Sequence, residues 1–86
     1  MKKVDFTNHA RLKIDLFKKH GVEIEEDFIR KTVIEPDNIE KGYKGRLIAQ
    51  KELDEGHVLR VVYEEEADKF IIITLYPGRK KRYEKD

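Results

Sequence analysis

Cysteine, tryptophan and serine are absent from the chain, and two of these absences exclude whole classes of chemistry. Without cysteine there is no disulfide framework, thiolate nucleophile or zinc ribbon, and the composition fits a reducing compartment such as the cytoplasm. Without serine no Ser-His-acid triad is possible. No apolar run approaches the roughly 20 residues of a membrane-spanning helix, and the first residues lack the apolar segment of a signal peptide. No membrane association is therefore expected.

Metal and cofactor chemistry has little support in the sequence. The three histidines, His9, His20 and His57, lack the spacing of metal ligands. The acidic runs EIEED and EEEAD are typical of a helix start and a hairpin turn. The segment GYKG has two glycines but lacks the flanking strand and helix of a phosphate-binding loop, so it is predicted to be a turn. No metal and no cofactor is expected.

The length of 86 residues predicts one small domain, 1–86, because so short a chain cannot support two hydrophobic cores. Charged residues make up 43% of the chain, but the apolar residues cluster in periodic blocks, which favours a folded protein. The net charge is only +1, and it is unevenly distributed. Residues 1–20 carry six cations and two acids, whereas residues 21–40 carry two cations and seven acids. A polyanion would therefore bind one face in preference to the other.

Two helices are expected near the N-terminus, after a possible short strand at 4–6. The first should cover about residues 8–20, because Thr7 or Asn8 can cap its start and Gly21 suits its end. The second should begin near Ile24, with acidic residues in its first turn, and should end before Pro36.

Three strands follow, at residues 46–53, 57–64 and 69–77, and they are separated by short hairpin turns. The predicted fold class is α+β, with two N-terminal helices packed on one face of an antiparallel sheet of three to four strands, in the order (β)ααβββ. The last residues, 79–86, are expected to be a loosely ordered basic tail.

Helix one carries ionisable residues within its apolar arc. A helical wheel places His9, Lys13 and His20 between Leu16 and Phe17, and the spacing of four residues brings Lys13 beside His9. His9 is therefore a candidate general base, with Lys13 as a neighbouring cation. A histidine near a helix start is also commonly a satisfied core or capping residue, and a lysine can extend its amine to solvent.

Arg60 is a lone cation among valines in the strand at 57–64. One interpretation is an edge-strand arginine, or an arginine paired with an acid; the other is a guanidinium on a sheet face that binds phosphate. Tyr76 and Thr74 share one parity on the next strand. A three-residue turn would place Arg60 opposite Thr74 and on the face of Tyr76, whereas a two-residue turn would reverse this.

The C-terminal segment TLYPGRKKRY combines cations with aromatic residues. Arg79, Lys80, Lys81 and Arg82 lie between Tyr76 and Tyr83. Basic residues interleaved with aromatic rings suit phosphate contacts and base stacking on single-stranded RNA. Four cations near a chain end are also a common solubility feature.

Several short motifs together resemble one family. They are HAR at the start of helix one, GV-x-I-E-E at the entry to helix two, a Pro-Asp turn, LRVVYE and IIITLYP. This combination resembles small proteins related to the RelE/ParE-like toxins, in the fold group of barnase-type and colicin-type ribonucleases. The resemblance covers residues 6–83. It implies a helical hairpin on a curved sheet, with RNA cleaved on the exposed sheet face without a metal.

Carried over to this sequence, the resemblance assigns catalytic roles to His9, Arg60 and Tyr76, with Thr74 to Pro77 as the matching strand end. Similar sequences often have arginine where Lys13 stands, and lysine loses the bidentate fork. The first hypothesis is a toxin-type endoribonuclease that acts on single-stranded or ribosome-bound RNA, with Lys13, Arg79, Lys80, Arg82 and Tyr83 as RNA contacts. The alternatives are an RNA-binding or ribosome-associated module without catalysis, and an interaction domain held by a small acidic antitoxin-like protein.

Overall fold

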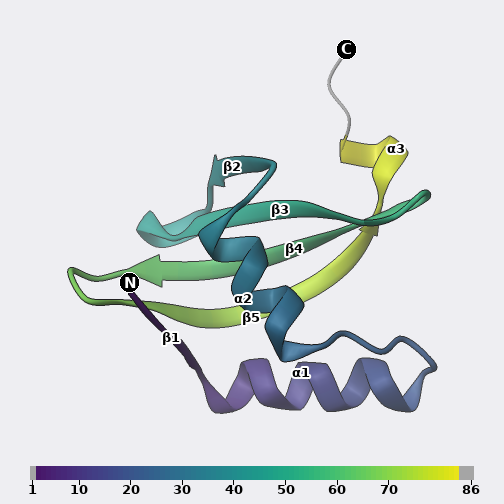
Figure 1. Cartoon of the computed structure of the whole chain (residues 1–86), viewed down its shortest axis with the longest axis horizontal. Coiled ribbons are helices and arrows are strands. Elements are labelled where there is room, and N and C mark those ends of the chain that lie inside the picture. Colours follow the sequence, from purple (N-terminus) through teal and green to yellow (C-terminus); the bar gives the residue numbers. More distant parts are fainter. Residues whose placement is uncertain (1, 84–86) are drawn as a thin grey trace.

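One mixed five-stranded sheet forms the centre of the protein, with strands in the order β1-β5-β4-β3-β2 (Figure 1). The computed structural model describes residues 2–83. Within that range no helix is long and apolar enough to span a bilayer. The elements in chain order are β1 (Lys3–Phe6), α1 (Asn8–Lys19), α2 (Glu26–Ile34), β2 (Asn38–Lys41), the 3-10 turn η1 (Tyr43–Gly45), β3 (Leu47–Asp54), β4 (His57–Glu65), β5 (Lys69–Arg79) and α3 (Lys80–Tyr83).

The predicted fold class is wrong in strand number, strand direction and element order, although the protein is α+β. The sheet has five strands instead of three or four, because residues 38–41 pair with β3 as an edge strand. It is mixed instead of antiparallel, because β1 runs parallel to β5. A short helix, α3, covers residues 80–83 of the expected tail, and the rest of that tail, 84–86, lies outside the described residues.

The ends of α1 follow from local sequence signals. The Thr7 hydroxyl accepts a hydrogen bond from the backbone N–H of Ala10 at 3.1 Å, which satisfies one of the unpaired donors at the helix start. After the helix, Gly21 adopts a φ of +83°, a left-handed conformation that glycine tolerates best. The expected helix at about 8–20 is thus confirmed as Asn8–Lys19.

The hydrophobic core lies between the sheet and both long helices. Ala10 from α1 and Ile29 from α2 are fully buried in the same cluster as Leu59 and Val61 of β4. Because side chains alternate along a strand, Arg60 points to the opposite face of the sheet. The face of the sheet away from this core is called the Arg60 face below.

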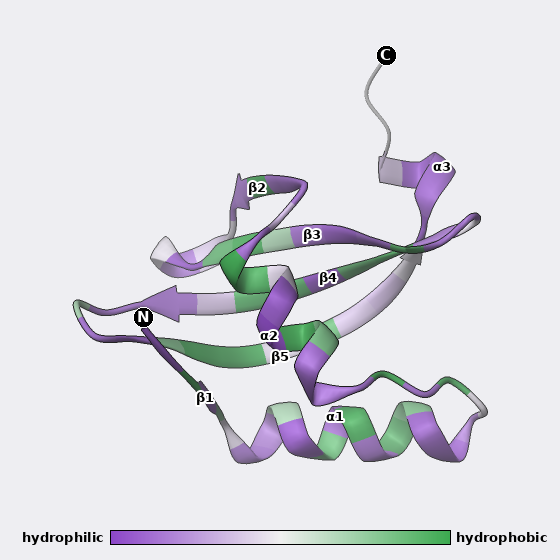
Figure 2. Ribbon diagram, in the orientation of Figure 1, coloured by the Kyte–Doolittle hydropathy of each residue, from purple (hydrophilic) through white to green (hydrophobic). Residues whose placement is uncertain are grey.

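A β-bulge at Ile73 determines which side chains of β5 reach the Arg60 face. Val62 of β4 pairs with Thr74, and the next residue pairs with Ile72, so Ile73 is the extra residue. The bulge places Ile72 and Leu75, three residues apart, in the same core cluster. Thr74 and Tyr76 therefore both point away from the core. Figure 2 shows the hydrophobic first part of β5 in green and the hydrophilic α3 in purple at the other end.

The burial of Tyr63 predicts a loss of stability at alkaline pH. Tyr63 is 1% exposed, and its ring packs edge-on against Phe70. Burial, with a smaller effect from the charge of Glu65, raises the pKa of the Tyr63 phenol above 10.0. A raised folded-state pKa gives stability that is complete below the unfolded pKa and is lost as pH rises through the folded pKa. We expect the free energy of unfolding to fall above about pH 10.

Urea denaturation of Tyr63→Phe at several pH values on both sides of 10 measures this effect. The variant should lose less stability than the wild type as pH rises, because it has no phenol to ionise. Tyr43→Phe is the matched control, since the Tyr43 side chain is exposed and should leave the alkaline loss unchanged. Equal pH profiles for wild type and Tyr63→Phe would contradict the assignment.

Candidate functional site

The start of α1 is attached to β5 at its bulge by Thr7. The Thr7 backbone N–H donates to the Ile72 carbonyl at 3.1 Å, and the Thr7 hydroxyl donates to the same carbonyl at 2.8 Å. This attachment brings the first turn of α1 to the point where β5 presents Thr74. As a result, His9 Nε2 lies 3.1 Å from Thr74 Oγ1, within hydrogen-bond distance.

Arg60 is the centre of a hydrogen-bond network on the Arg60 face. Its Nε donates to the Tyr76 hydroxyl at 3.0 Å, its Nη2 donates to Glu40 at 2.9 Å, and its Nη1 donates to the Gln50 side-chain oxygen. Arg60 is only 4% exposed, so these contacts replace the water that its charge would otherwise need. The network joins strands β2, β3, β4 and β5.

Arg60 remains charged in this position. Burial by itself lowers the pKa of the guanidinium, but the hydrogen bonds to Tyr76 and Glu40 raise the pKa, and the net shift is upward. With all three nitrogens engaged and Glu40 opposite, this guanidinium does not face solvent as a phosphate clamp would. The hydrogen bond from Arg60 instead fixes the position of the Tyr76 hydroxyl. Because the hydroxyl oxygen accepts this bond, the hydroxyl hydrogen is left to donate to another group.

The short helix α3 folds back over this network. The Tyr83 ring lies over Arg60, with 4.2 Å between the guanidinium carbon and the ring centroid. Gly78 makes this approach possible, because a Cβ at that position would lie 2.4 Å from the Tyr83 ring. The cation–π contact, which the absence of a side chain at Gly78 permits, holds α3 and its cations at one end of the Arg60 face.

The C-terminal cations differ in their contacts. Lys80 forms an ion pair with Glu52, and its backbone N–H donates to Gly56 at 2.8 Å. Arg79, Lys81 and Arg82 are exposed and form no ion pair within residues 2–83. Of the basic residues predicted to contact RNA, Arg79 and Arg82 therefore have charges open to an anionic ligand, and Lys80 is partly engaged in the fold.

The structure brings together most of the predicted site residues but not all of them. The turn at 66–68 has three residues, and Arg60 and Tyr76 share one face, as predicted for that turn length. The predicted pairing is wrong, because Arg60 lies opposite Tyr76, and Thr74 lies opposite Val62. His9 lies beside Thr74, two residues before Tyr76 on the same strand face. Lys13 is separate from this group, since its amine lies over the Phe17 ring on α1 at 5.0 Å.

Sequence reasoning missed Gln50 and Glu40, two of the oxygen acceptors around Arg60. Gln50 faces Arg60 across β3 and β4, and Glu40 reaches it from β2. A polar residue at the centre of the predicted strand 46–53 was the available signal for Gln50. Glu40 had none, because its strand was not predicted.

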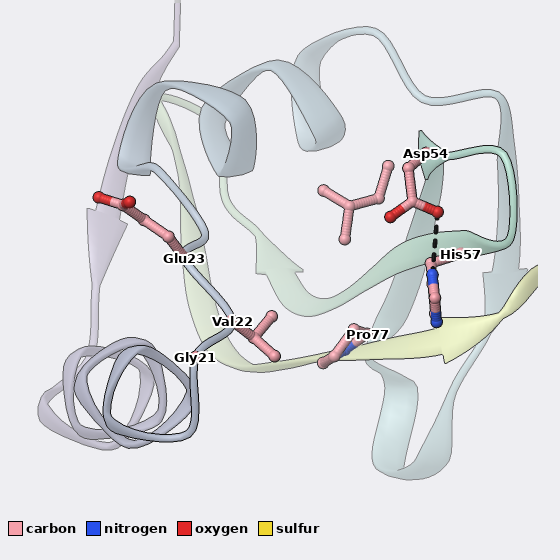
Figure 3. Close-up of a pocket in the computed structure, with 7 residues that line it drawn as sticks. Gly21, Val22, Glu23, Asp54, His57 and Pro77 are labelled. Atoms are coloured by element: carbon pink, nitrogen blue, oxygen red, sulfur yellow. Dashed lines mark hydrogen bonds and ion pairs between the residues drawn. The ribbon is translucent and has the colours of Figure 1, made fainter.

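A separate cavity of about 470 Å³ lies at the β3–β4 hairpin, lined by Gly21, Val22, Glu23, Leu53, Asp54, His57 and Pro77 (Figure 3). His57 Nδ1 lies 2.9 Å from Asp54 Oδ1, and the Gly56 backbone N–H donates to the same oxygen at 2.9 Å. The hydrogen bond with His57 has the largest effect on Asp54 and lowers the pKa of its carboxyl, and the hydrogen bond from Gly56 lowers it further. These bonds close the hairpin turn, so we assign the pair a structural role.

Metal ligation and similarity to known proteins give no further guide to the site. Among the described residues, no group of three or more His, Asp or Glu side chains is arranged to hold a metal ion. Comparison of the chain with protein-family models, curated proteins and solved structures finds no match. The chemistry of the site therefore rests on the geometry of the Arg60 face.

The burial of Arg60 predicts a large stability cost for its removal. Arg60→Ala should lower the free energy of unfolding by about 2 to 3 kcal/mol, somewhat less than the loss of one partner from a fully buried ion pair, because Glu40 keeps partial access to solvent. Chemical denaturation measures the loss. Arg46→Ala is the matched control, because Arg46 pairs with Glu64 at 3.3 Å on the surface and should cost at most about 1 kcal/mol. Equal losses in the two variants would contradict the structural role of Arg60.

Proposed function

We propose that the Arg60 face binds single-stranded RNA and cleaves it without a metal, as a toxin-type endoribonuclease does. The observation that carries this proposal is that the His9 imidazole lies within hydrogen-bond distance of Thr74, and that Tyr76, two residues further along β5, presents its hydroxyl on the same face. The Cα atoms of residues two apart on one strand face lie about 7 Å apart, and this proximity of Thr74 to Tyr76 supports the proposal that one phosphodiester contacts both groups. A cytoplasmic location, where RNA is available, belongs to the same proposal.

The proposed reaction begins with the ribose 2′-hydroxyl adjacent to the scissile phosphate. His9 removes the proton from this hydroxyl, its oxygen attacks phosphorus, and the bond from phosphorus to the 5′-oxygen breaks. The products are a 2′,3′-cyclic phosphate and a 5′-hydroxyl, which takes its proton from solvent. Thr74 holds the imidazole through Nε2, which leaves Nδ1 to exchange the proton, and within residues 2–83 Nδ1 has no hydrogen-bond partner.

Tyr76 and Arg60 have different roles in this scheme. The Tyr76 hydroxyl donates its hydrogen to a phosphate oxygen, where negative charge develops during attack. Arg60 is a positioning residue, because it reaches the phosphate only through the Tyr76 oxygen. Arg79 and Arg82 supply exposed positive charge for the flanking phosphates.

Binding without cleavage is the second candidate function, and the state of Arg60 favours it. The guanidinium is buried and already neutralised by Glu40, so it offers the phosphate no direct contact. In that case the exposed cations and aromatic rings bind RNA, or a small acidic partner protein, and His9 has no chemical role. Ribosome-bound RNA is a further target with the same phosphate chemistry.

Cleavage of single-stranded RNA in the presence of EDTA tests the proposal. His9→Ala should lower the cleavage rate by at least about 100-fold, because a positioned general base contributes that much. His20→Ala is the matched control, since this exposed histidine lies at the other end of α1 and should retain full activity. Thr74→Val should give an intermediate loss, because the imidazole loses its anchor.

Two results would oppose catalysis. Wild-type products indistinguishable from those of His9→Ala would show that the cleavage is contamination or chance hydrolysis. RNA binding that His9→Ala leaves intact, in a protein that cleaves nothing, would establish the binding function instead. In both functions the double variant with Arg79→Gln and Arg82→Gln should weaken binding and reduce its dependence on salt.

A further inference from the structure

The turn between β2 and β3 carries the most exposed of the large hydrophobic side chains within residues 2–83. Tyr43 is 82% exposed. Its loop is closed by two backbone hydrogen bonds, from Gly42 N–H to the Arg46 carbonyl at 2.7 Å and from Arg46 N–H to the Tyr43 carbonyl at 3.2 Å. The ring is therefore displayed on an ordered turn and takes no part in the core.

The backbone of the same turn is unusual. Lys44 has a φ of +58°, and it is the single non-glycine residue with positive φ in residues 2–83. A lysine in this left-handed conformation is strained, and asparagine or glycine would relieve the strain. The conformation places the Lys44 amine 5.7 Å from the Tyr43 ring centroid. Positive φ at both Lys44 and Gly45, with the hydrogen bond from the Arg46 N–H to the Tyr43 carbonyl, is the geometry of a type I′ hairpin turn. The strain at Lys44 therefore serves the tight connection of β2 to β3, and Tyr43 and Lys44 occupy the first two positions of this turn.

The base of this turn lies on the Arg60 face. Glu40, two residues before Gly42, binds Arg60 there. Gly42 lies against the Ile48 side chain, since a Cβ at this position would be 3.2 Å from it. Ile48 pairs with Val62, which is two residues from Arg60 and therefore on the same face of the sheet. The turn leads into the first residue of β3. At the other end of this strand, the backbone N–H of Lys80 in α3 donates a hydrogen bond to the carbonyl of Gly56, two residues after β3 ends. The turn between β2 and β3, which carries Tyr43, and α3 thus lie at opposite ends of the sheet (Figure 1).

We propose that Tyr43 is a base-stacking contact for single-stranded nucleic acid and that Lys44 contacts the adjacent phosphate. This inference rests on the proposed function and extends it, because it adds a second binding point at the other end of the Arg60 face. An exposed aromatic ring beside a cation suits a nucleotide, since every base has a face that can stack. A strand that stacks on Tyr43 and reaches α3 must cross the face between them, past Arg60 and Tyr76.

Binding to a short oligonucleotide, measured by fluorescence polarisation, tests the inference. The probes are labelled oligouridine and the 2′-deoxy version of the same sequence, which cannot be cleaved by attack of a 2′-hydroxyl. Tyr43→Ala should weaken binding about tenfold, because loss of one stacked base has about that effect. Tyr43→Phe keeps the ring and should bind within about twofold of the wild type.

Lys44→Asn separates the charge from the backbone conformation. Asparagine tolerates positive φ, so the turn should persist and the thermal midpoint should not fall. The loss of one phosphate contact should reduce the slope of log affinity against log salt by about one. Lys31→Asn, which removes an exposed cation from α2 on the other side of the sheet, should change neither affinity nor slope.

The outcomes distinguish this inference from the proposed function. Wild-type protein that binds neither probe, or Tyr43→Ala that binds like the wild type, would overturn it. Tyr43→Phe as weak as Tyr43→Ala would also overturn it, because the hydroxyl and not the ring would then be the contact. Deoxy-probe binding that depends on Tyr43, in a protein that cleaves no RNA, would support the stacking contact and refute the ribonuclease function.

Discussion

The buried guanidinium of Arg60 is the interaction on which one whole face of this protein depends. A charge that is 4% exposed must be matched by oxygen acceptors, and these come from Glu40, Gln50 and Tyr76 on three other strands. Tyr83 then covers the guanidinium from α3. The same contacts that stabilise the charge therefore fix the edge strand β2, orient the Tyr76 hydroxyl and place the C-terminal cations. A substrate would meet Tyr76 and α3 before it met Arg60.

The bulge at Ile73 is the second constraint, because it turns β5 so that one strand serves both sides of the sheet. Ile72 and Leu75 enter the core, while Thr74 and Tyr76 face outward. Thr7 binds the backbone at this bulge and also caps α1. One threonine thus couples the start of the helix to the strand that carries the site, and this coupling explains why His9 reaches Thr74 from a position 65 residues away in the sequence.

Local signals in the sequence could predict the two long helices and the three long strands, whereas α3 and the non-local features could not be predicted. The cap at Thr7 and the break at Gly21 define α1 within a few residues. The strand Asn38–Lys41 has one apolar residue and four residues in all, so no periodicity marks it. The parallel pairing of Val4 with Phe70 joins distant segments. His9, Arg60 and Tyr76 were identified as candidates by residue type, but their spacing depends on the bulge, and Tyr43 emerged only from its exposure.

The central claim is that nucleic acid binds the Arg60 face, and NMR chemical-shift mapping during titration with a short deoxyoligonucleotide tests it most directly. The account predicts that the largest changes in backbone amide shifts occur in η1, in β5 around Thr74 and Tyr76, and in α3. Residues of α2, which lies on the opposite side of the sheet, should change little. Changes concentrated in α2 or around the Asp54–His57 cavity, with the Arg60 face unaffected, would contradict the account.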